Sequence, residues 1–170
     1  MRTKLPINLK SWIEDHRELL KPPVGNKMVY EDTDFMIMIV GGPNIRKDFH
    51  VNRTEEFFFQ IEGDINLKIR EEGQTIDVPI KEGEIFLLPP SVPHSPQRPA
   101  NTVGLVVEKK RAQGQLDGFQ WYCDHCNSKV YDEFFQLENI VTQLPPLFEG
   151  FYSSPEKSTC KNCGTRVERL

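Results

Sequence analysis

Hydrophobic and polar positions alternate with a period of two in several short stretches of the chain. In residues 65–71 (INLKIRE), Ile65, Leu67 and Ile69 fall on one face, and residues 75–80 (TIDVPI) show the same alternation. This period is typical of strands that bury one face. Strands are also indicated by mainly apolar runs that end near glycine or proline, namely residues 35–40 (FMIMIV), 57–61 (FFFQI), 85–90 (IFLLPP) and 102–108 (TVGLVVE).

The order of these stretches predicts the fold class. Between residues 29 and 109 the strand signals follow one another, separated by turns with glycine or proline and with no helix between them. Such a succession predicts an all-β sandwich or barrel. Within it, we expect residues 85–90 to form a buried strand that ends at two prolines. In the run from Phe57 to Phe59, at least one ring must face the other way.

The two ends of the chain differ from this middle part. Residues 8–20 (NLKSWIEDHRELL) place apolar side chains at spacings of three and four, which predicts a short amphipathic helix. Residues 21–26 (KPPVGN) cannot continue the helix and predict an extended connector. After the last strand the composition changes, and residues 132–150 have moderate helix and loop character. We therefore expect a barrel with its helix in residues 1–116 and a C-terminal metal-binding appendage in residues 117–170.

Composition and charge limit the partners that we expect. The 170 residues carry a formal net charge of −4, so no overall basic field favours nucleic acid. No apolar run approaches the roughly 20 residues that a membrane-spanning helix needs. The N-terminal residues contain no apolar block before a small-residue cleavage site, and we therefore expect a cytoplasmic protein.

Two histidines and a glutamate are spaced as a metal site requires. His50 ends one strand, Glu56 opens the next after a tight turn, and His94 lies in a proline-rich turn. Two imidazoles and one carboxylate occupy one face of an octahedral ion and leave three positions open, which suits non-heme ferrous iron. Either histidine alone is better explained as a satisfied polar residue at a barrel end. The three together favour a metal site.

Two arginines are phased with these histidines. Arg46 lies four residues before His50, and Arg98 lies four residues after His94. An even spacing along a strand places two side chains on the same side. A planar guanidinium binds a carboxylate through two parallel hydrogen bonds. A single arginine of this kind is more often a solvated surface charge, but the two phased residues favour an organic acid as substrate.

The four cysteines form two pairs with the spacing of metal knuckles. Cys123 and Cys126 make the first pair, and Cys160 and Cys163 make the second after an interval of 33 residues. Two such pairs supply four thiolates to one tetrahedral ion, either iron or zinc. The alternative is two structural disulfides, which are uncommon in a chain without a secretory signal. We expect the metal to hold the small appendage together.

The motifs together resemble known families. The pattern Gly41…His50-x-Asn52…Glu56…Gly63, followed by Gly83-x5-Pro89…His94, resembles the two motifs of the cupin barrel. The usual cupin has a second histidine where this chain has Asn52, which reduces four ligands to three. Over essentially the whole chain, the sequence resembles the 3-hydroxyanthranilate 3,4-dioxygenase family in its short bacterial and fungal form. The stretches that show this are residues 38–64, 87–108 (LLPPSVPHSPQRPANTVGLVVE), 121–127 (WYCDHCN) and 160–163 (CKNC).

The resemblance implies an all-β cupin (jelly-roll-like) barrel with a short N-terminal helix and a small C-terminal appendage that binds metal through four cysteines. It implies that His50, Glu56 and His94 hold a catalytic Fe(II), and that Glu56 also contributes to substrate binding. Arg46 would be catalytic and lie beside the dioxygen site, Arg98 would bind the substrate carboxylate, and Glu108 would bind substrate and take part in catalysis. Cys123, Cys126, Cys160 and Cys163 would hold a second, rubredoxin-like iron or a zinc ion.

The same resemblance implies the reaction and the assembly. A homodimer would convert 3-hydroxyanthranilate and O2 to 2-amino-3-carboxymuconate semialdehyde, the precursor of quinolinate on the route from tryptophan to NAD. Two other classes stay open. Another cupin metalloenzyme, such as a thiol dioxygenase or an isomerase, would be favoured by a substrate without a carboxylate. A non-catalytic, metal-stapled binding module would be favoured by a barrel that folds fully without iron.

Overall fold

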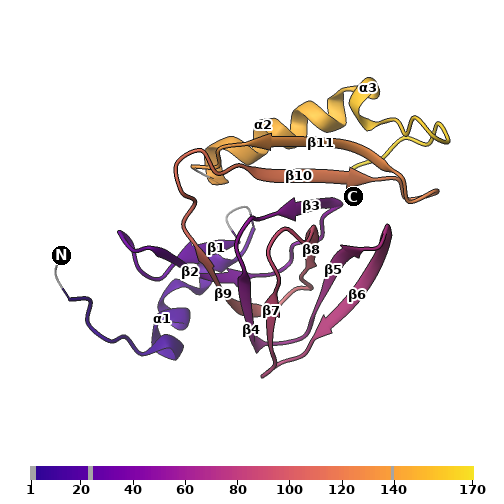
Figure 1. The fold of residues 1–170 in the computed structure, drawn as a ribbon. Coiled ribbons are helices and arrows are strands. Elements are labelled where there is room, and N and C mark those ends of the chain that lie inside the picture. Colours follow the sequence, from indigo (N-terminus) through magenta and orange to yellow (C-terminus); the bar gives the residue numbers. More distant parts are fainter. Residues whose placement is uncertain (1–2, 23–24, 139) are drawn as a thin grey trace.

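Two antiparallel β-sheets that face each other form the main body of the molecule (Figure 1). The computed structural model describes residues 3–22, 25–138 and 140–170. The first sheet has the order β1 (Asn26–Met28), β2 (Phe35–Gly41), β9 (Val103–Lys109), β4 (Glu56–Glu62) and β7 (Ile85–Leu88). The second has the order β11 (Lys129–Phe135), β10 (Asp117–Tyr122), β3 (Asp48–Val51), β8 (His94–Gln97), β5 (Ile65–Glu71) and β6 (Gln74–Ile80). The predicted all-β, cupin-like fold is therefore confirmed.

The core lies between the two sheets and explains the aromatic run in β4. Phe58 points inward and is buried, packed with Val106 of β9 and with Ile65 and Leu67 of β5. Its two neighbours in the run face the other side of the sheet and are half-buried. Complete burial of a side chain of this size contributes about 1.5–3 kcal/mol, so the inward ring anchors the strand that begins with Glu56.

The strands agree with the predicted stretches, with two informative differences. β5 covers the predicted residues 65–71. The prediction of a buried strand in residues 85–90 is wrong, because β7 is an edge strand and leaves Ile85 and Leu87 65% and 54% exposed. His94, which we expected in a turn, begins the short strand β8 and pairs with β3.

The N-terminal helix forms where the apolar spacing predicted it. It consists of α1 (Leu9–His16) and the 3₁₀ helix η1 (Arg17–Leu20). The Asn8 side chain accepts a hydrogen bond from the Ser11 backbone N–H and caps the first turn. Ile13 packs with Leu20 against the outer face of the first sheet. Residues 23–24 of the predicted connector lie outside the described residues, and residue 26 already belongs to β1.

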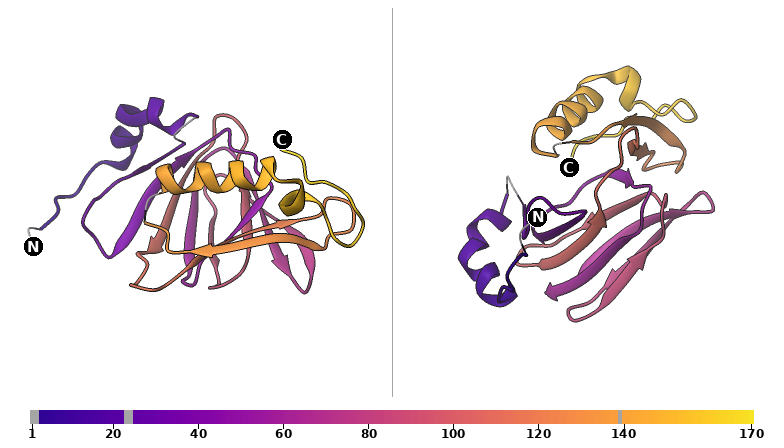
Figure 2. Two further views of the ribbon diagram at one scale, coloured as in Figure 1. Left: turned by 90° about the horizontal axis from the view of Figure 1, so that it is seen from above. Right: turned by 60° about the vertical axis from the view of Figure 1, so that its left-hand side comes forward.

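The C-terminal segment continues the second sheet. β10 pairs with β3 on one edge and with β11 on the other. The helices α2 (Ile140–Ser153) and α3 (Pro155–Ser158) lie over β10 and β11 (Figure 2). Trp121 of β10 stacks on Phe151 of α2, with ring centroids 4.3 Å apart. Part of the segment that we expected to be helix and loop is thus strand β11, and residue 139 lies outside the described residues. The boundary after residue 116 stays a prediction.

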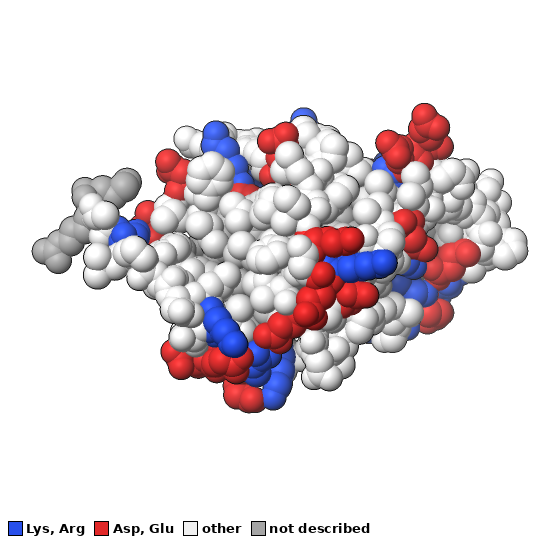
Figure 3. Space-filling view, turned by 90° about the horizontal axis from the view of Figure 1, so that it is seen from below, with Lys and Arg blue, Asp and Glu red and all other residues white. Residues whose placement is uncertain are grey.

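Charged side chains of both signs are mixed on the surface. Seen from below, lysine and arginine lie beside aspartate and glutamate, around a broad uncharged area (Figure 3). In the described part of the chain, no helix has the length and apolar character needed to cross a membrane.

Candidate metal and substrate site

A small cavity between the two sheets brings together all six site residues that the sequence predicted for the barrel. Its volume is about 130 Å³, and both sheets contribute to its lining. The predicted residues that line it are Arg46, His50, Glu56, His94, Arg98 and Glu108. Residues that lie up to 62 positions apart in the sequence therefore face one space.

Strand pairing sets the positions of the two histidines and the glutamate. His50 of β3 lies directly opposite His94 of β8, and Glu56 opens β4 in the facing sheet. Each offers one ligand atom, and these atoms lie within 4.8 Å of one another. The Val92 carbonyl accepts a hydrogen bond from His94 Nδ1 at 3.0 Å, which leaves His94 Nε2 facing Glu56 Oε2 at 3.1 Å. These three side chains could therefore hold one metal ion, and the hydrogen bond from the far ring nitrogen of His94 is of the kind that orients a histidine ligand.

Burial and mutual charge set the protonation of these three groups. Burial lowers the pKa of His50, and the Asp117 hydrogen bond only partly offsets this effect. Burial opposes the shifts of the other two, but the pKa of Glu56 is held low by His94 and the pKa of His94 is raised by Glu56. Glu56 Oε2 is buried and has no hydrogen bond of suitable geometry. A buried carboxylate oxygen of this kind, beside two imidazoles, fits a divalent cation.

Arg98 is a buried cation without a carboxylate partner in the described part of the chain. It is 2% exposed, and its Nη1 donates to Gln60 Oε1 at 3.3 Å. Burial lowers the pKa of its guanidinium to about 10. Gly104 leaves the room for it, because a Cβ there would lie 2.8 Å from Arg98 Nη1. A guanidinium in this state can bind an anion that enters the cavity.

Arg46 differs from Arg98 because it already has a partner. Its Nε donates to both carboxylate oxygens of Asp48, at 3.0 and 2.9 Å, and its Nη2 contacts the same group. Asp48 therefore fixes the position of the Arg46 guanidinium, and the Arg46 side chain lines the same cavity.

Glu108 is held by two neighbours that sequence reasoning did not assign to the site. The Asn52 amide donates to Glu108 Oε2 at 2.6 Å, and Arg111 Nη1 lies 2.9 Å from the same oxygen. Burial, with the nearby Glu56 charge, raises the pKa of Glu108 to about 7, although Arg111 opposes the shift. Asn52 stands where the usual cupin has a second histidine ligand, and its side chain here donates to Glu108. In the sequence Arg111 belongs to the basic run KKR, which gave no signal of a buried role.

The C-terminal segment supplies part of the cavity wall. Phe119 of β10 stacks on His50 with ring centroids 5.1 Å apart, and Leu137 and Leu144 also line the cavity. The sequence gave no signal for these residues, because their contacts depend on the pairing of β10 with β3. The segment thus contributes walls as well as cysteines.

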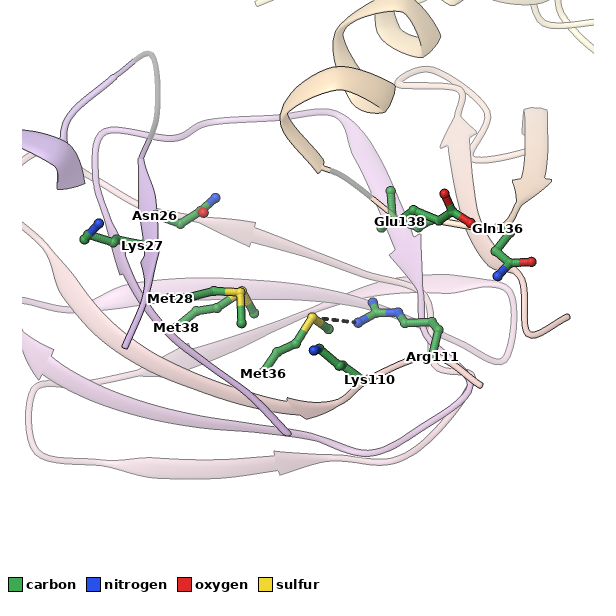
Figure 4. A pocket seen from close by; sticks show the side chains of 10 residues that line it. Asn26, Lys27, Met28, Met36, Met38, Lys110, Arg111, Gln136 and Glu138 are labelled. Carbon is green, nitrogen blue, oxygen red and sulfur yellow. Dashed lines mark hydrogen bonds between the residues drawn. The ribbon is translucent and has the colours of Figure 1, made fainter. Parts of the chain in front are cut away.

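A second, outer pocket of about 450 Å³ adjoins the cavity. The two share Asn26, Met38, Arg111 and Leu137. In Figure 4, three methionine side chains gather on one side of the outer pocket, and Arg111 lies beside Met36. Arg111 Nη1 contacts the Met36 sulfur at 3.8 Å.

The four cysteines come together near the end of the chain as free thiols. Their Sγ atoms lie within 4.8 Å of one another, with Cys123 to Cys163 and Cys126 to Cys160 each at 3.5 Å. Each pair closes a tight turn, in which Asn127 and Gly164 adopt positive φ of 64° and 77°. Four sulfurs at these separations suit a closed tetrahedral metal shell.

Comparisons with known proteins show what the whole chain is similar to. A family model described as 3-hydroxyanthranilic acid dioxygenase matches residues 1–152, so the second cysteine pair lies beyond the match. A 3-hydroxyanthranilate 3,4-dioxygenase of Xanthomonas euvesicatoria pv. vesicatoria is 55% identical over 159 residues, which are 94% of this chain and 90% of that protein. A protein of the same name from Jannaschia sp. is 55% identical over 92% of this chain and 88% of its own.

Solved structures give a more distant match. A cupin-2 domain protein from Shewanella frigidimarina is 19% identical, covers 61% of this chain and 93% of its own, and has a TM-score of 0.49.

Proposed function

Because the chain belongs to the 3-hydroxyanthranilic acid dioxygenase family, we propose that it opens the ring of 3-hydroxyanthranilate with O2. Both oxygen atoms enter the product, 2-amino-3-carboxymuconate semialdehyde, so the reaction needs no external reductant. This product would feed the formation of quinolinate and NAD. The buried Arg98 without a carboxylate partner in the described residues is the observation that supports an aromatic acid most directly.

His50, Glu56 and His94 would hold ferrous iron. The proposal is supported by the spacing of their ligand atoms and by the buried Glu56 oxygen that lacks a hydrogen bond. Ferrous iron, when bound, supplies open positions for the substrate and activates O2. The aromatic wall of Phe58 and Phe119 excludes water from this side of the cavity, which strengthens electrostatic interactions inside it.

The surrounding residues would orient the substrate and move its proton. Arg98 would bind the ring carboxylate through two hydrogen bonds and fix the ring before oxygen reacts. Glu108, with a pKa of about 7, would accept the proton of the ring hydroxyl and return it later. Arg46, held by Asp48, would place its positive charge beside the negative charge that develops on oxygen.

The cysteine site would have a structural role. Four thiolates close the shell of an iron or zinc ion and leave no position for substrate. Cysteines that bind metal and form no disulfide would also fit a reducing, cytoplasmic location.

We propose a homodimer in which a second copy covers the outer face at β7. Ile85, Leu87 and Phe35 are 65%, 54% and 55% exposed there, and a groove of about 410 Å³ runs beside them. Sedimentation of Ile85→Glu should show a monomer. A variant that stays dimeric would place the interface elsewhere, and a monomeric wild-type protein would contradict the proposal.

Oxygen uptake with three related compounds tests the substrate. 3-Hydroxyanthranilate should be consumed, whereas 2-aminophenol, which lacks the carboxylate, and anthranilate, which lacks the hydroxyl, should react far more slowly. Equal rates with 2-aminophenol would show that Arg98 does not select a carboxylate and would favour another cupin metalloenzyme.

A further inference from the structure

Arg111 forms the centre of a buried chain of polar contacts. On one side its Nη1 lies 2.9 Å from Glu108 Oε2. On the other side its Nε and Nη2 donate to Asp117, at 2.8 Å to Oδ1 and 2.5 Å to Oδ2. Asp117 Oδ2 in turn lies 2.6 Å from His50 Nε2. These contacts therefore link Glu108 to His50 through Arg111 and Asp117, two residues to which the proposed function assigns no role.

These contacts are almost completely withdrawn from solvent. The side chains of Arg111, Glu108 and Asp117 are 6%, 4% and 1% exposed. A buried cation between two carboxylates is weak evidence for stability, because the cost of removing the charges from water offsets their attraction. Such a group does fix geometry, since the planar guanidinium holds both partners in set directions.

Arg111 also stands at the boundary between the cavity and the outer pocket. Its side chain lines both spaces, and the Met36 sulfur covers one edge of its guanidinium (Figure 4). The side chain is thus held from three sides, by Glu108, Asp117 and Met36. It is not free to move between partners in the way that an exposed arginine does.

We propose that Arg111 is a positioning residue, which fixes Glu108 on one side and, through Asp117, the imidazole of His50 on the other. This proposal rests on the proposed function, in which Glu108 binds substrate and His50 binds iron. Residues that orient a metal ligand from behind change metal affinity when they are altered. A purely structural Arg111 would change only the stability of the fold.

The test compares Arg111→Lys with Arg17→Lys in the iron-loaded protein. Both variants keep the positive charge but lose the planar guanidinium, which can donate to two partners in fixed directions. Arg17 also bridges two carboxylates, of Glu14 and Glu62, but at the surface. Barrel iron is followed during chelation by the EPR signal of its nitric oxide adduct, which needs an open coordination position and is not expected from a closed thiolate site.

For Arg111→Lys, we expect iron to dissociate about tenfold faster or more. Substrate affinity, measured without oxygen, should fall about tenfold, a coupling of the size found within one hydrogen-bond network. Arg17→Lys should change neither. Unchanged iron dissociation and unchanged substrate affinity in Arg111→Lys, with only a lower melting temperature, would overturn the proposal.

Two double variants separate the contact of Arg111 with Glu108 from its contact with Asp117. When Asp117→Asn is already present, adding Arg111→Lys should not change iron dissociation further. When Glu108→Gln is already present, adding Arg111→Lys should not change substrate affinity further. Undiminished effects in both backgrounds would contradict the proposed route. If Arg111→Lys does not fold, Asp117→Asn alone decides, since iron dissociation as slow as in the wild type would refute the link to His50. The iron measurements need no ring cleavage, so they stay valid if the proposed function fails.

Discussion

Glu108 shows how a single buried residue gains its chemistry from its surroundings. It lies on β9, directly across from Glu56 on β4. Burial and this neighbouring carboxylate raise its pKa to about 7, while Arg111 limits the shift. A carboxyl group with this pKa exchanges protons readily near neutral pH, which suits the role that we propose for it.

The raised pKa of Glu108 predicts how stability depends on pH in the metal-free protein. The folded state binds the proton more tightly than the unfolded state, whose pKa is near 4.5. The stability that this residue contributes is therefore complete below about pH 4.5 and is lost as pH rises through about 7, by up to about 3 kcal/mol. In Glu108→Gln this loss should be absent, which denaturant unfolding between about pH 4 and pH 8 measures.

The exposed Glu18→Gln is the matched control, since its side chain is 83% exposed. It should follow the wild-type pH dependence. An unchanged pH slope in Glu108→Gln would mean that another group titrates in this range.

At the scale of single residues, the sequence predicted the site members but not their partners. The spacings of His50, Glu56 and His94 follow local strand patterns, so they could be found from the sequence. Asn52 meets Glu108 across 56 positions and Asp117 meets His50 across 67. Such contacts depend on strand register, which local patterns do not determine.

At the scale of elements, β9 shapes the site by lacking a side chain at one position. Gly104 lies behind the Arg98 guanidinium, and a Cβ there would also come 2.8 Å from Gln60 Oε1. Both neighbours are the ends of flexible side chains, so the strand itself can accept an added Cβ. Gly104→Ala should therefore move Arg98 rather than unfold the barrel.

We expect Gly104→Ala to weaken binding of 3-hydroxyanthranilate by about 1–3 kcal/mol, the range for hydrogen bonds to charged groups. Gly150→Ala is the control, because a Cβ in that position of α2 meets nothing within 4 Å. Its KM should match the wild-type value, and its melting temperature should be no lower. If Gly104→Ala keeps the wild-type KM, the carboxylate does not bind at Arg98.

The predicted elements were most accurate where the period was clear. β5 and the N-terminal helix follow their patterns closely. β7 was wrongly expected to be buried, because a continuous apolar run does not show whether a strand lies at an edge. The strands β10 and β11 were missed, since their burial comes from α2 and from the pairing with β3.

At the scale of the whole molecule, the cysteine site and the barrel are joined by one sheet. β10 runs from the cavity wall at Phe119 to the first cysteine pair, and it pairs with β3 beside His50. Trp121, two residues before Cys123, packs in one cluster with Phe119 of the cavity wall and with Phe151 of α2. A metal held by the four cysteines would therefore support a segment that closes the cavity, and would not be placed to react with substrate.

Replacing Cys123 and Cys126 with serine should destabilise the segment from residue 117 onward, since the proposed structural metal would lose two of its ligands. Relative to the wild type, hydrogen exchange should accelerate more in β11 and α2 than in β4 and β9. Turnover per barrel-bound iron should persist in the folded fraction. If turnover falls to zero while barrel iron and fold are intact, the cysteine site takes part in catalysis.

The central claim is that iron held by His50, Glu56 and His94 cleaves 3-hydroxyanthranilate with O2. The most direct measurement is oxygen uptake together with substrate loss, at several levels of iron occupancy of the barrel site. We predict one molecule of O2 consumed per molecule of substrate, a rate proportional to barrel iron, and no uptake above background in His50→Ala, Glu56→Ala or His94→Ala. Fully loaded wild-type protein without uptake, or a ligand variant with wild-type uptake, would contradict the claim.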